Sequence, residues 1–181
     1  MKLTLNNSVI VPELCTAQEE ADTRIFLHAK HASLTHTSTV IVAEDTDVLI
    51  LGLAFFNEIA NLYIRCGTQN RVRYIDINKL GASLGQDSCK ALIGLHAFTG
   101  CVSVSAFGGS GKLNALKLMM KSEQFCQAMI KLGNDWALPA DIFSVLQEFT
   151  CKMYASGINI VEVNELRYQL FRAKIHKLLG K

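Results

Sequence analysis

The sequence predicts an α/β fold in which a mostly parallel central sheet is flanked by helices and followed by a helical C-terminal extension. The strongest strand signal is the run Thr39–Ala43, which reads Thr-Val-Ile-Val-Ala. A continuous β-branched run is typical of a strand covered on both faces, as parallel sheets require. Strand patterns are confined to the first part of the chain and helical periodicity fills the rest, so we expect a layered α/β part before a helical part.

The predicted elements follow one another without a repeat or a low-complexity linker. A short hairpin comes first, then a helix with an acidic start, the buried strand, a second helix, a hairpin at the sheet edge and a series of helices. Their ranges are Lys2–Leu5 with Val9–Val11, Gln18–Ala32, Thr39–Ala43, Glu44–Phe56, Leu62–Arg65 with Val72–Ile75, Ile77–Leu84, Ser88–Phe98, Leu113–Met120, Glu123–Lys131, Pro139–Met153 and Val163–Leu178. We expect residues 1–98 to form the α/β layer and residues 99–181 the helical element of one continuous domain.

Composition excludes several classes of protein. The chain has 181 residues, of which 50% are hydrophobic and 19% charged, so it is neither disordered nor collagen-like. Its six cysteines include no CxxC pair, which predicts reduced, mostly buried thiols and argues against a cysteine zinc site. The longest apolar run, Val48–Phe56, has nine residues and falls short of the roughly 20 that cross a bilayer. We therefore expect an intracellular protein without a membrane partner, the nucleus being one option.

Charge is unevenly distributed along the chain. The net charge is +2, but residues 1–111 carry eight basic and ten acidic side chains, whereas residues 112–181 carry ten basic and six acidic ones. An acidic part followed by a basic part would suit a protein that binds both a metal ion and a polyanion.

Two acidic pairs are the first candidates for chemistry. Asp45 and Asp47 follow the strongest strand and precede a helix, the edge at which open α/β folds place their ligands. Glu20 and Asp22 stand at the start of the preceding helix. Carboxylates fixed in this way can hold a hard divalent cation. The structural alternative is that Asp45 caps its helix and that the other acidic side chains interact favourably with the helix dipoles.

A glycine-rich turn, Gly108-Gly109-Ser110-Gly111-Lys112, is the second candidate. It is not a nucleotide P-loop, because Ala106 replaces the first glycine and Leu113 replaces the Ser/Thr that would reach magnesium. A glycine turn that opens a helix still exposes backbone N–H groups to an anion, and Lys112, Lys117 and Lys121 follow it. The structural alternative is a flexible turn before a solvated basic helix.

Isolated histidines and cysteines carry weaker signals. His28 and His31 lie one turn apart, but no third metal ligand is near them in the sequence, so we interpret them as surface residues. His96 stands in an apolar stretch and is interpreted as a core histidine. Cys101 follows Gly100 without a neighbour that would lower the pKa of a thiol, so a nucleophilic role is not predicted.

Three motifs together resemble the PIN-like, flap-endonuclease superfamily. They are Glu20-Ala21-Asp22-Thr23, Asp45-Thr46-Asp47-Val48-Leu49 and Gly94-Leu95-His96-Ala97-Phe98-Thr99-Gly100-Cys101. Within that superfamily, the chain is most similar to uncharacterised, often transposon-associated members from animal genomes. The resemblance extends from Glu13 to about Lys174 and includes Asn164-Glu165-Leu166-Arg167-Tyr168.

The resemblance implies a nuclease ancestry with an incomplete site. Enzymes of this superfamily cut DNA near branch points or ends with two magnesium ions held by acidic residues, to which Glu20, Asp22, Asp45 and Asp47 correspond. A further metal-binding aspartate is expected after Gly100-Cys101, where this chain has Val102. Further ligands lie on earlier strands, so the chain corresponds to a C-terminal portion, with residues 1–98 a partial PIN-like layer. Mg²⁺ or Mn²⁺ is therefore expected to bind weakly or not at all.

The resemblance also assigns the glycine turn to DNA binding, through Gly108, Gly109, Gly111, Lys112 and Lys117. Three functions remain open at this stage. The chain is a metal-dependent nuclease completed by residues outside it, a catalytically inactive pseudoenzyme that binds DNA or a protein partner, or a fragment retained for interaction alone. The first two are favoured, as an incomplete or degenerate nuclease domain acting on or binding structured DNA.

Overall fold

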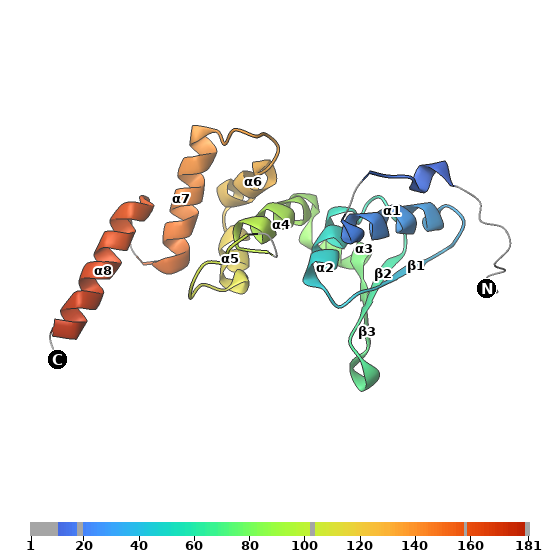
Figure 1. Ribbon diagram of the computed structural model, residues 1–181, viewed down its shortest axis with the longest axis horizontal. Helices are drawn as coiled ribbons and strands as arrows, with labels where there is room; N and C mark the ends of the chain where they lie inside the picture. The colour runs from blue at the N-terminus through green and yellow to red at the C-terminus, as the bar shows by residue number, and fades with distance from the viewer. Residues whose placement is uncertain (1–10, 18–19, 102–103, 158, 180–181) are drawn as a thin grey trace. The chain divides into compact units, whose positions relative to one another are not determined.

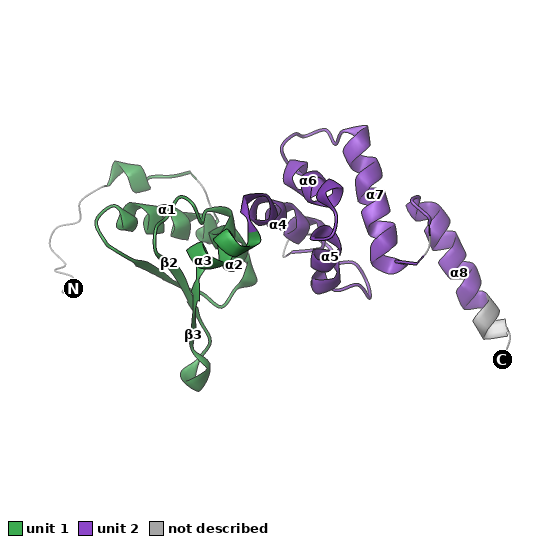
Figure 2. Cartoon of the chain, turned by 180° about the vertical axis from the view of Figure 1, so that it is seen from behind, with its two compact units in different colours: residues 1–84 green, residues 85–181 purple. Residues whose placement is uncertain are grey.

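The computed structural model describes residues 11–17, 20–101, 104–157 and 159–179, with side chains in the last helix described as far as Ile175. Contacts divide the chain into two compact units, residues 1–84 and 85–181 (Figure 2). The predicted hairpin Lys2–Leu5 with Val9–Val11 lies outside the described residues, apart from Val11. The predicted α/β layer runs to residue 98, whereas the contacts assign the helix before this position to the second unit.

The first unit is a small mixed sheet with helices (Figure 1). Its elements are η1 (Pro12–Leu14), α1 (Ala21–Ser33), β1 (Thr39–Val42), α2 (Thr46–Ala54), β2 (Leu62–Cys66), η2 (Gln69–Arg71), β3 (Arg73–Asp76) and α3 (Ile77–Leu84). The strand order is β1-β2-β3, with Thr39 opposite Leu62 in the parallel pair and Tyr63 opposite Asp76 in the antiparallel pair. The α/β class and the hairpin of β2 and β3 are confirmed, but a large parallel sheet is not present among the described residues.

β1 corrects one prediction. Ile41 is buried, but Val40 and Val42 are 48% and 64% exposed. β1 is an edge strand of the described sheet, and successive side chains of a strand point to opposite faces. The prediction that Thr39–Ala43 is covered on both faces is therefore wrong for these residues, although the strand itself is where the β-branched run placed it.

Asn78, at the start of α3, ties the sheet of the first unit to the loop after α2. Its Oδ1 accepts a hydrogen bond from the Leu62 N–H at 2.7 Å, while its Nδ2 donates to the carbonyl oxygens of Phe56 and Ile59 at 2.6 and 2.9 Å. Leu62 and Ile59 are almost completely buried. An amide side chain can satisfy buried backbone donors and acceptors at once, so Asn78 fixes where β2 begins.

The second unit is helical. It contains α4 (Gln86–Phe98), α5 (Lys112–Met119), α6 (Glu123–Lys131), α7 (Ala140–Tyr154) and α8 (Val163–Leu179). These bounds confirm the predicted helices to within one or two residues. Ser122 caps α6 by accepting a hydrogen bond from the Phe125 N–H at 3.4 Å, as a serine before a helix commonly does.

Close contact between α4 and α6 holds the second unit together. A Cβ atom built on Gly94 would lie 2.1 Å from the carbonyl oxygen of Met129, so only glycine allows the two backbones to approach this closely. Aromatic contacts extend the same core, since the ring centroids of Phe125 and Phe149 lie 5.2 Å apart and Phe98 packs against Phe149. The position of α4 therefore depends on one glycine.

Gly94→Ala is expected to destabilise the protein by about 2 kcal/mol or more, because the added methyl group meets backbone atoms that cannot rotate away. Alanine has the higher helix propensity, worth about 1 kcal/mol, so propensity alone predicts the opposite sign. Gly108→Ala is the control, since its Cβ would meet nothing within 4 Å. Urea unfolding of both variants measures the difference, and equal or higher stability of Gly94→Ala would contradict the packing described here.

Candidate functional site

The two acidic pairs lie at helix starts of the first unit. Glu20 is the N-cap residue of α1, and Asp22 belongs to the first turn of that helix. The Glu20 side chain forms no capping hydrogen bond; instead the Thr23 hydroxyl donates to the Glu20 carbonyl oxygen at 3.0 Å. The Glu20 carboxylate is exposed to solvent, whereas Asp22 is half-buried.

Asp45 caps α2. Its Oδ1 accepts a hydrogen bond from the Asp47 N–H at 3.0 Å, and its backbone is extended, as is usual for an N-cap residue. Asp47 follows in the first turn, where its negative charge interacts favourably with the helix dipole. The capping alternative for Asp45 is thereby confirmed, because the sequence Asp-Thr-Asp places a carboxylate acceptor two residues before the N–H that needs one.

The chain direction places both pairs at one edge of the sheet. α1 and β1 run in opposite directions (Figure 1), since only residues 34–38 connect the end of α1 to the start of β1. A groove between them is lined along its length by both elements, from Ala21 to Ala32 and from Thr39 to Val42. The start of α1, with Glu20 and Asp22, therefore lies at the edge where β1 ends and Asp45 follows.

Sharing an edge does not bring four carboxylates together. Among the described residues, no group of three or more His, Cys, Asp and Glu side chains is placed to hold a metal ion. Phosphodiester cleavage by the two-metal mechanism needs several carboxylates around ions about 4 Å apart. The described residues therefore do not fit a complete centre for Mg²⁺ or Mn²⁺, and Val102, which replaces the expected further aspartate, lies outside them.

The glycine turn is held by its base and open at its tip. Phe107 packs between Phe98 and Tyr154, with ring centroids 5.3 and 6.2 Å away. Gly108, Gly109 and Gly111 are exposed, and a Cβ at any of them would meet nothing within 4 Å. Gly109 has φ +75°, a conformation that favours glycine. The turn therefore presents its backbone to solvent immediately before α5.

Lys112 is the first residue of α5, and its side chain contacts His96 from α4. Lys112 Nζ lies 2.9 Å from His96 Nδ1. An ammonium group can only donate, so His96 Nδ1 is the acceptor in this contact. The interpretation of His96 as a core histidine is corrected: it is half-buried and holds a lysine at the start of a helix.

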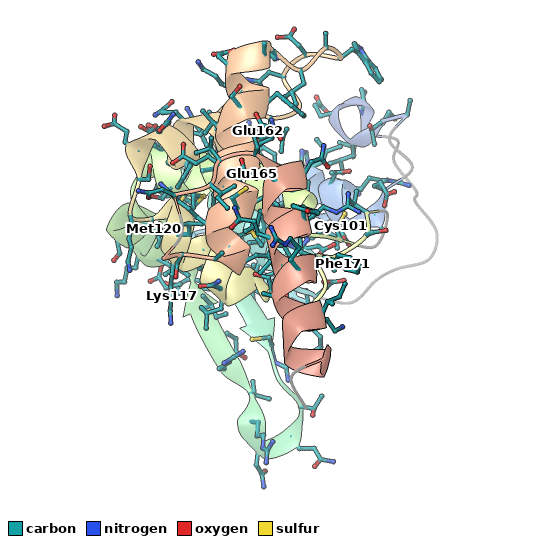
Figure 3. All side chains as sticks on the ribbon, turned by 90° about the vertical axis from the view of Figure 1, so that its left-hand side faces the viewer. Cys101, Lys117, Met120, Glu162, Glu165 and Phe171 are labelled. Carbon is teal, nitrogen blue, oxygen red and sulfur yellow. The ribbon has the colours of Figure 1, made fainter. Side chains whose placement is uncertain are left out.

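Lys117 lies elsewhere on α5. It follows Lys112 by five positions, which corresponds to about 140° around the helix axis. Figure 3 shows Lys117 beside Met120 on one side of the second unit and Cys101 on the other. The two lysines predicted to bind one phosphate chain therefore project from different faces of α5, and Lys112 alone stands beside the glycine turn.

The six cysteines are free thiols, and the prediction that most are buried holds for half of them: Cys66, Cys89 and Cys151 are buried, Cys101 and Cys126 half-buried and Cys15 exposed. Burial raises the pKa of the Cys89, Cys126 and Cys151 thiols, and acidic neighbours add to the effect at the last two. A higher thiol pKa lowers the thiolate fraction at neutral pH, which makes these three side chains poor nucleophiles. Cys101 is half-buried after α4 and forms a two-bond backbone bridge with Val104, with N···O distances of 3.1 and 3.2 Å.

Comparisons of the chain with family models, with curated proteins and with solved structures found no match. Membership of the PIN-like superfamily therefore stays a prediction that depends on the sequence motifs. In the part of the chain that the structure describes, no helix combines the length and the apolar character needed to cross a bilayer.

Substitutions at Asp45 separate its capping role from a metal-binding role. Asp45→Ala is expected to cost about 1 kcal/mol of unfolding free energy, whereas Asp45→Asn keeps the capping acceptor and stays within a few tenths of the parent. Urea unfolding measures both values. If Mn²⁺ stabilises the parent in thermal unfolding and Asp45→Asn removes that shift, Asp45 is a metal ligand as well as a cap; an unchanged shift would contradict its assignment to a metal site.

Proposed function

We propose that the chain is a degenerate nuclease domain of the PIN-like type that binds structured DNA through the phosphate backbone. The observation that carries the proposal is the open glycine turn, which leads into a helix whose first residue is an exposed lysine held by His96. The first N–H groups of a helix have no partner within the helix, and together with a lysine they suit a phosphate oxygen.

The charge around this turn supports the same proposal. Between Asp87 and Glu123 the chain has no acidic residue, and this stretch carries Lys90, Lys112, Lys117 and Lys121. A phosphate group that approaches the turn therefore meets no carboxylate from residues 88–122. His96 Nδ1 accepts from Lys112 Nζ, so a ring nitrogen and not a carboxylate positions this lysine beside the turn.

Binding by this route has a defined chemical character. Contacts of lysine and backbone N–H groups with phosphates position a duplex but do not read its bases, so we expect little sequence preference and a strong dependence on salt. Gly108, Gly109 and Gly111 let a phosphate approach the backbone without a side chain in the way. Lys117 would contact a different phosphate or none, because it projects from another face of α5.

A metal-dependent nuclease is the second candidate function. The observation in its favour is that Glu20, Asp22, Asp45 and Asp47 occupy one edge of the first unit's sheet. Against it stand the capping role of Asp45 and the lack of a three-ligand group among the described residues. An inactive protein-interaction module is the alternative if neither DNA binding nor cleavage is found.

Lys112→Gln is expected to weaken binding of a fluorescent flap or hairpin DNA roughly threefold to tenfold at low salt, and to lower the slope of log affinity against log salt by about 0.9. Fluorescence anisotropy over a salt series measures both. Lys131→Gln, an exposed lysine at the end of α6, is the control for loss of one charge. Equal effects of the two variants would show that net charge alone, and not the turn, attracts DNA.

The same substrate tests whether the chain has lost its chemistry. With Mg²⁺ or Mn²⁺ we expect the parent to bind without cutting, and Val102→Asp to raise Mn²⁺-dependent cleavage by restoring the missing carboxylate. Gel analysis of the products measures the rate. Asp47→Asn in the Val102→Asp background is the control and should remove the cleavage. If the parent itself cleaves the DNA and Asp47→Asn removes this cleavage, the chain is instead an active nuclease.

A further inference from the structure

Among the side chains that the structure describes, those of the first turn of α8 pack on the second unit. Leu166 is 3% exposed and forms a small core with Cys151 of α7 and Ile160, against which Val163 packs. Beyond it, every residue from Arg167 to Lys174 is exposed. Figure 1 and Figure 2 both show α8 extending past α7 with no other described part of the second unit beside its C-terminal half. We refer to residues 167–175 as the distal segment.

The distal segment carries an apolar stripe that faces away from α7. Tyr168, Phe171 and Ile175 fall within about 60° of one another around the helix axis, at the spacing i, i+3, i+7. Tyr168 and Phe171 are 60% and 61% exposed, and Phe171 is labelled on α8 in Figure 3. Leu166, which docks on α7, lies about 160° from Tyr168. The contact with α7 therefore leaves Tyr168 and Phe171 exposed, while Ile175 is half-buried.

The charged residues of this segment all have the same sign. From Arg167 to the end of the sequence there are five Lys or Arg residues and no Asp or Glu. Arg172 flanks the stripe on one side, with its guanidinium 5.7 Å from the Tyr168 ring, while Arg167 and Lys174 lie on the other. An exposed aromatic stripe with cations on both sides suits a binding partner that offers an apolar phase bordered by negative charge.

We propose that the distal segment of α8 binds the surface of an anionic phospholipid bilayer, with the stripe in the acyl boundary and its cations among the phosphate headgroups. A bilayer supplies both chemistries in one plane, and α7 lies on the opposite side of the helix, where it does not obstruct a flat surface. Long basic side chains keep their charges at the headgroup level while their stems remain apolar.

Other occupants fit these features less well. A second copy of α8 would bring two chains of like charge together, which is unfavourable. Duplex DNA offers phosphates but no apolar phase for Phe171. The expectation of no membrane partner depended on the lack of a spanning segment, and a helix lying in the interface needs none. A helix that stands alone for three turns is marginal in water, so binding would also stabilise it.

The test uses the full chain with sonicated vesicles of phosphatidylcholine alone and of phosphatidylcholine with about 30% phosphatidylserine. Flotation or co-sedimentation measures the bound fraction. We expect at least tenfold stronger binding to the anionic vesicles, and about a thirtyfold loss on removing the Arg172 and Lys174 charges together as Arg172→Gln/Lys174→Gln. Phe171→Ser should lower binding severalfold, whereas Leu170→Ser, an exposed residue on the same side of the helix as Leu166, should leave it unchanged.

Each alternative has its own result. Equal binding to neutral and anionic vesicles, or none to either, overturns the proposal. So does equal loss in Phe171→Ser and Leu170→Ser, because the stripe would then have no special role. Tighter binding to an acidic amphipathic peptide, or displacement from vesicles by duplex DNA with Phe171→Ser unaffected, assigns the segment to a protein or to nucleic acid. Lys112→Gln leaves vesicle binding unchanged, which separates this proposal from DNA binding at the turn.

Discussion

Backbone contact between α4 and α6 at Gly94 is the constraint on which the candidate DNA-binding surface depends. The Met129 carbonyl oxygen occupies the space that any other residue's Cβ would need, so α4 lies at a distance from α6 that only glycine permits. Two residues later, His96 accepts a hydrogen bond from Lys112, and Phe98 contacts the Phe107 that anchors the glycine turn. A shift of α4 would therefore move both contacts that hold the turn and its lysine.

In the first unit, a carboxylate that the sequence motif assigns to metal binding has a structural use. Asp45 caps α2 through Oδ1, an interaction that a helix start needs whether or not a metal is present. A residue with such a structural use is retained after catalysis is lost, which is why an acidic pair at a helix start is weak support for a nuclease. Glu20 differs, because its side chain forms no cap and is exposed. The capping alternative therefore does not account for the Glu20 carboxylate.

The sequence could predict elements better than surfaces. Element bounds follow from local signals, such as Ser122 before α6 and the β-branched run of β1. The helices of the second unit and β1 agree with the structure to within one or two residues, whereas the predicted start of the first helix, Gln18, lies three residues before Ala21. The exposure of Val40 and Val42 depends on what lies beside and above the strand, which a local run of residues does not encode. The contact between His96 and Lys112 joins two helices across the turn at Gly100. The apolar residues next to His96 in the sequence therefore led to the wrong prediction of a core histidine. Topology alone could place the two acidic pairs at one edge of the sheet. Whether their carboxylates come close enough to share a metal ion depends on side-chain distances, which the sequence does not give.

The second unit presents two cationic surfaces whose chemistry differs. At the glycine turn, exposed backbone and one positioned lysine suit a small, hard anion such as a phosphate, and no large apolar side chain is exposed at the tip formed by residues 108–111. On the distal segment of α8, aromatic residues form the centre of the surface and basic residues lie only at its borders. Electrostatic contacts weaken steeply with salt, whereas burial of an apolar stripe does not, because it depends on the area removed from water. Salt therefore separates the two surfaces physically: at high ionic strength the turn should lose its ligand before the α8 stripe does.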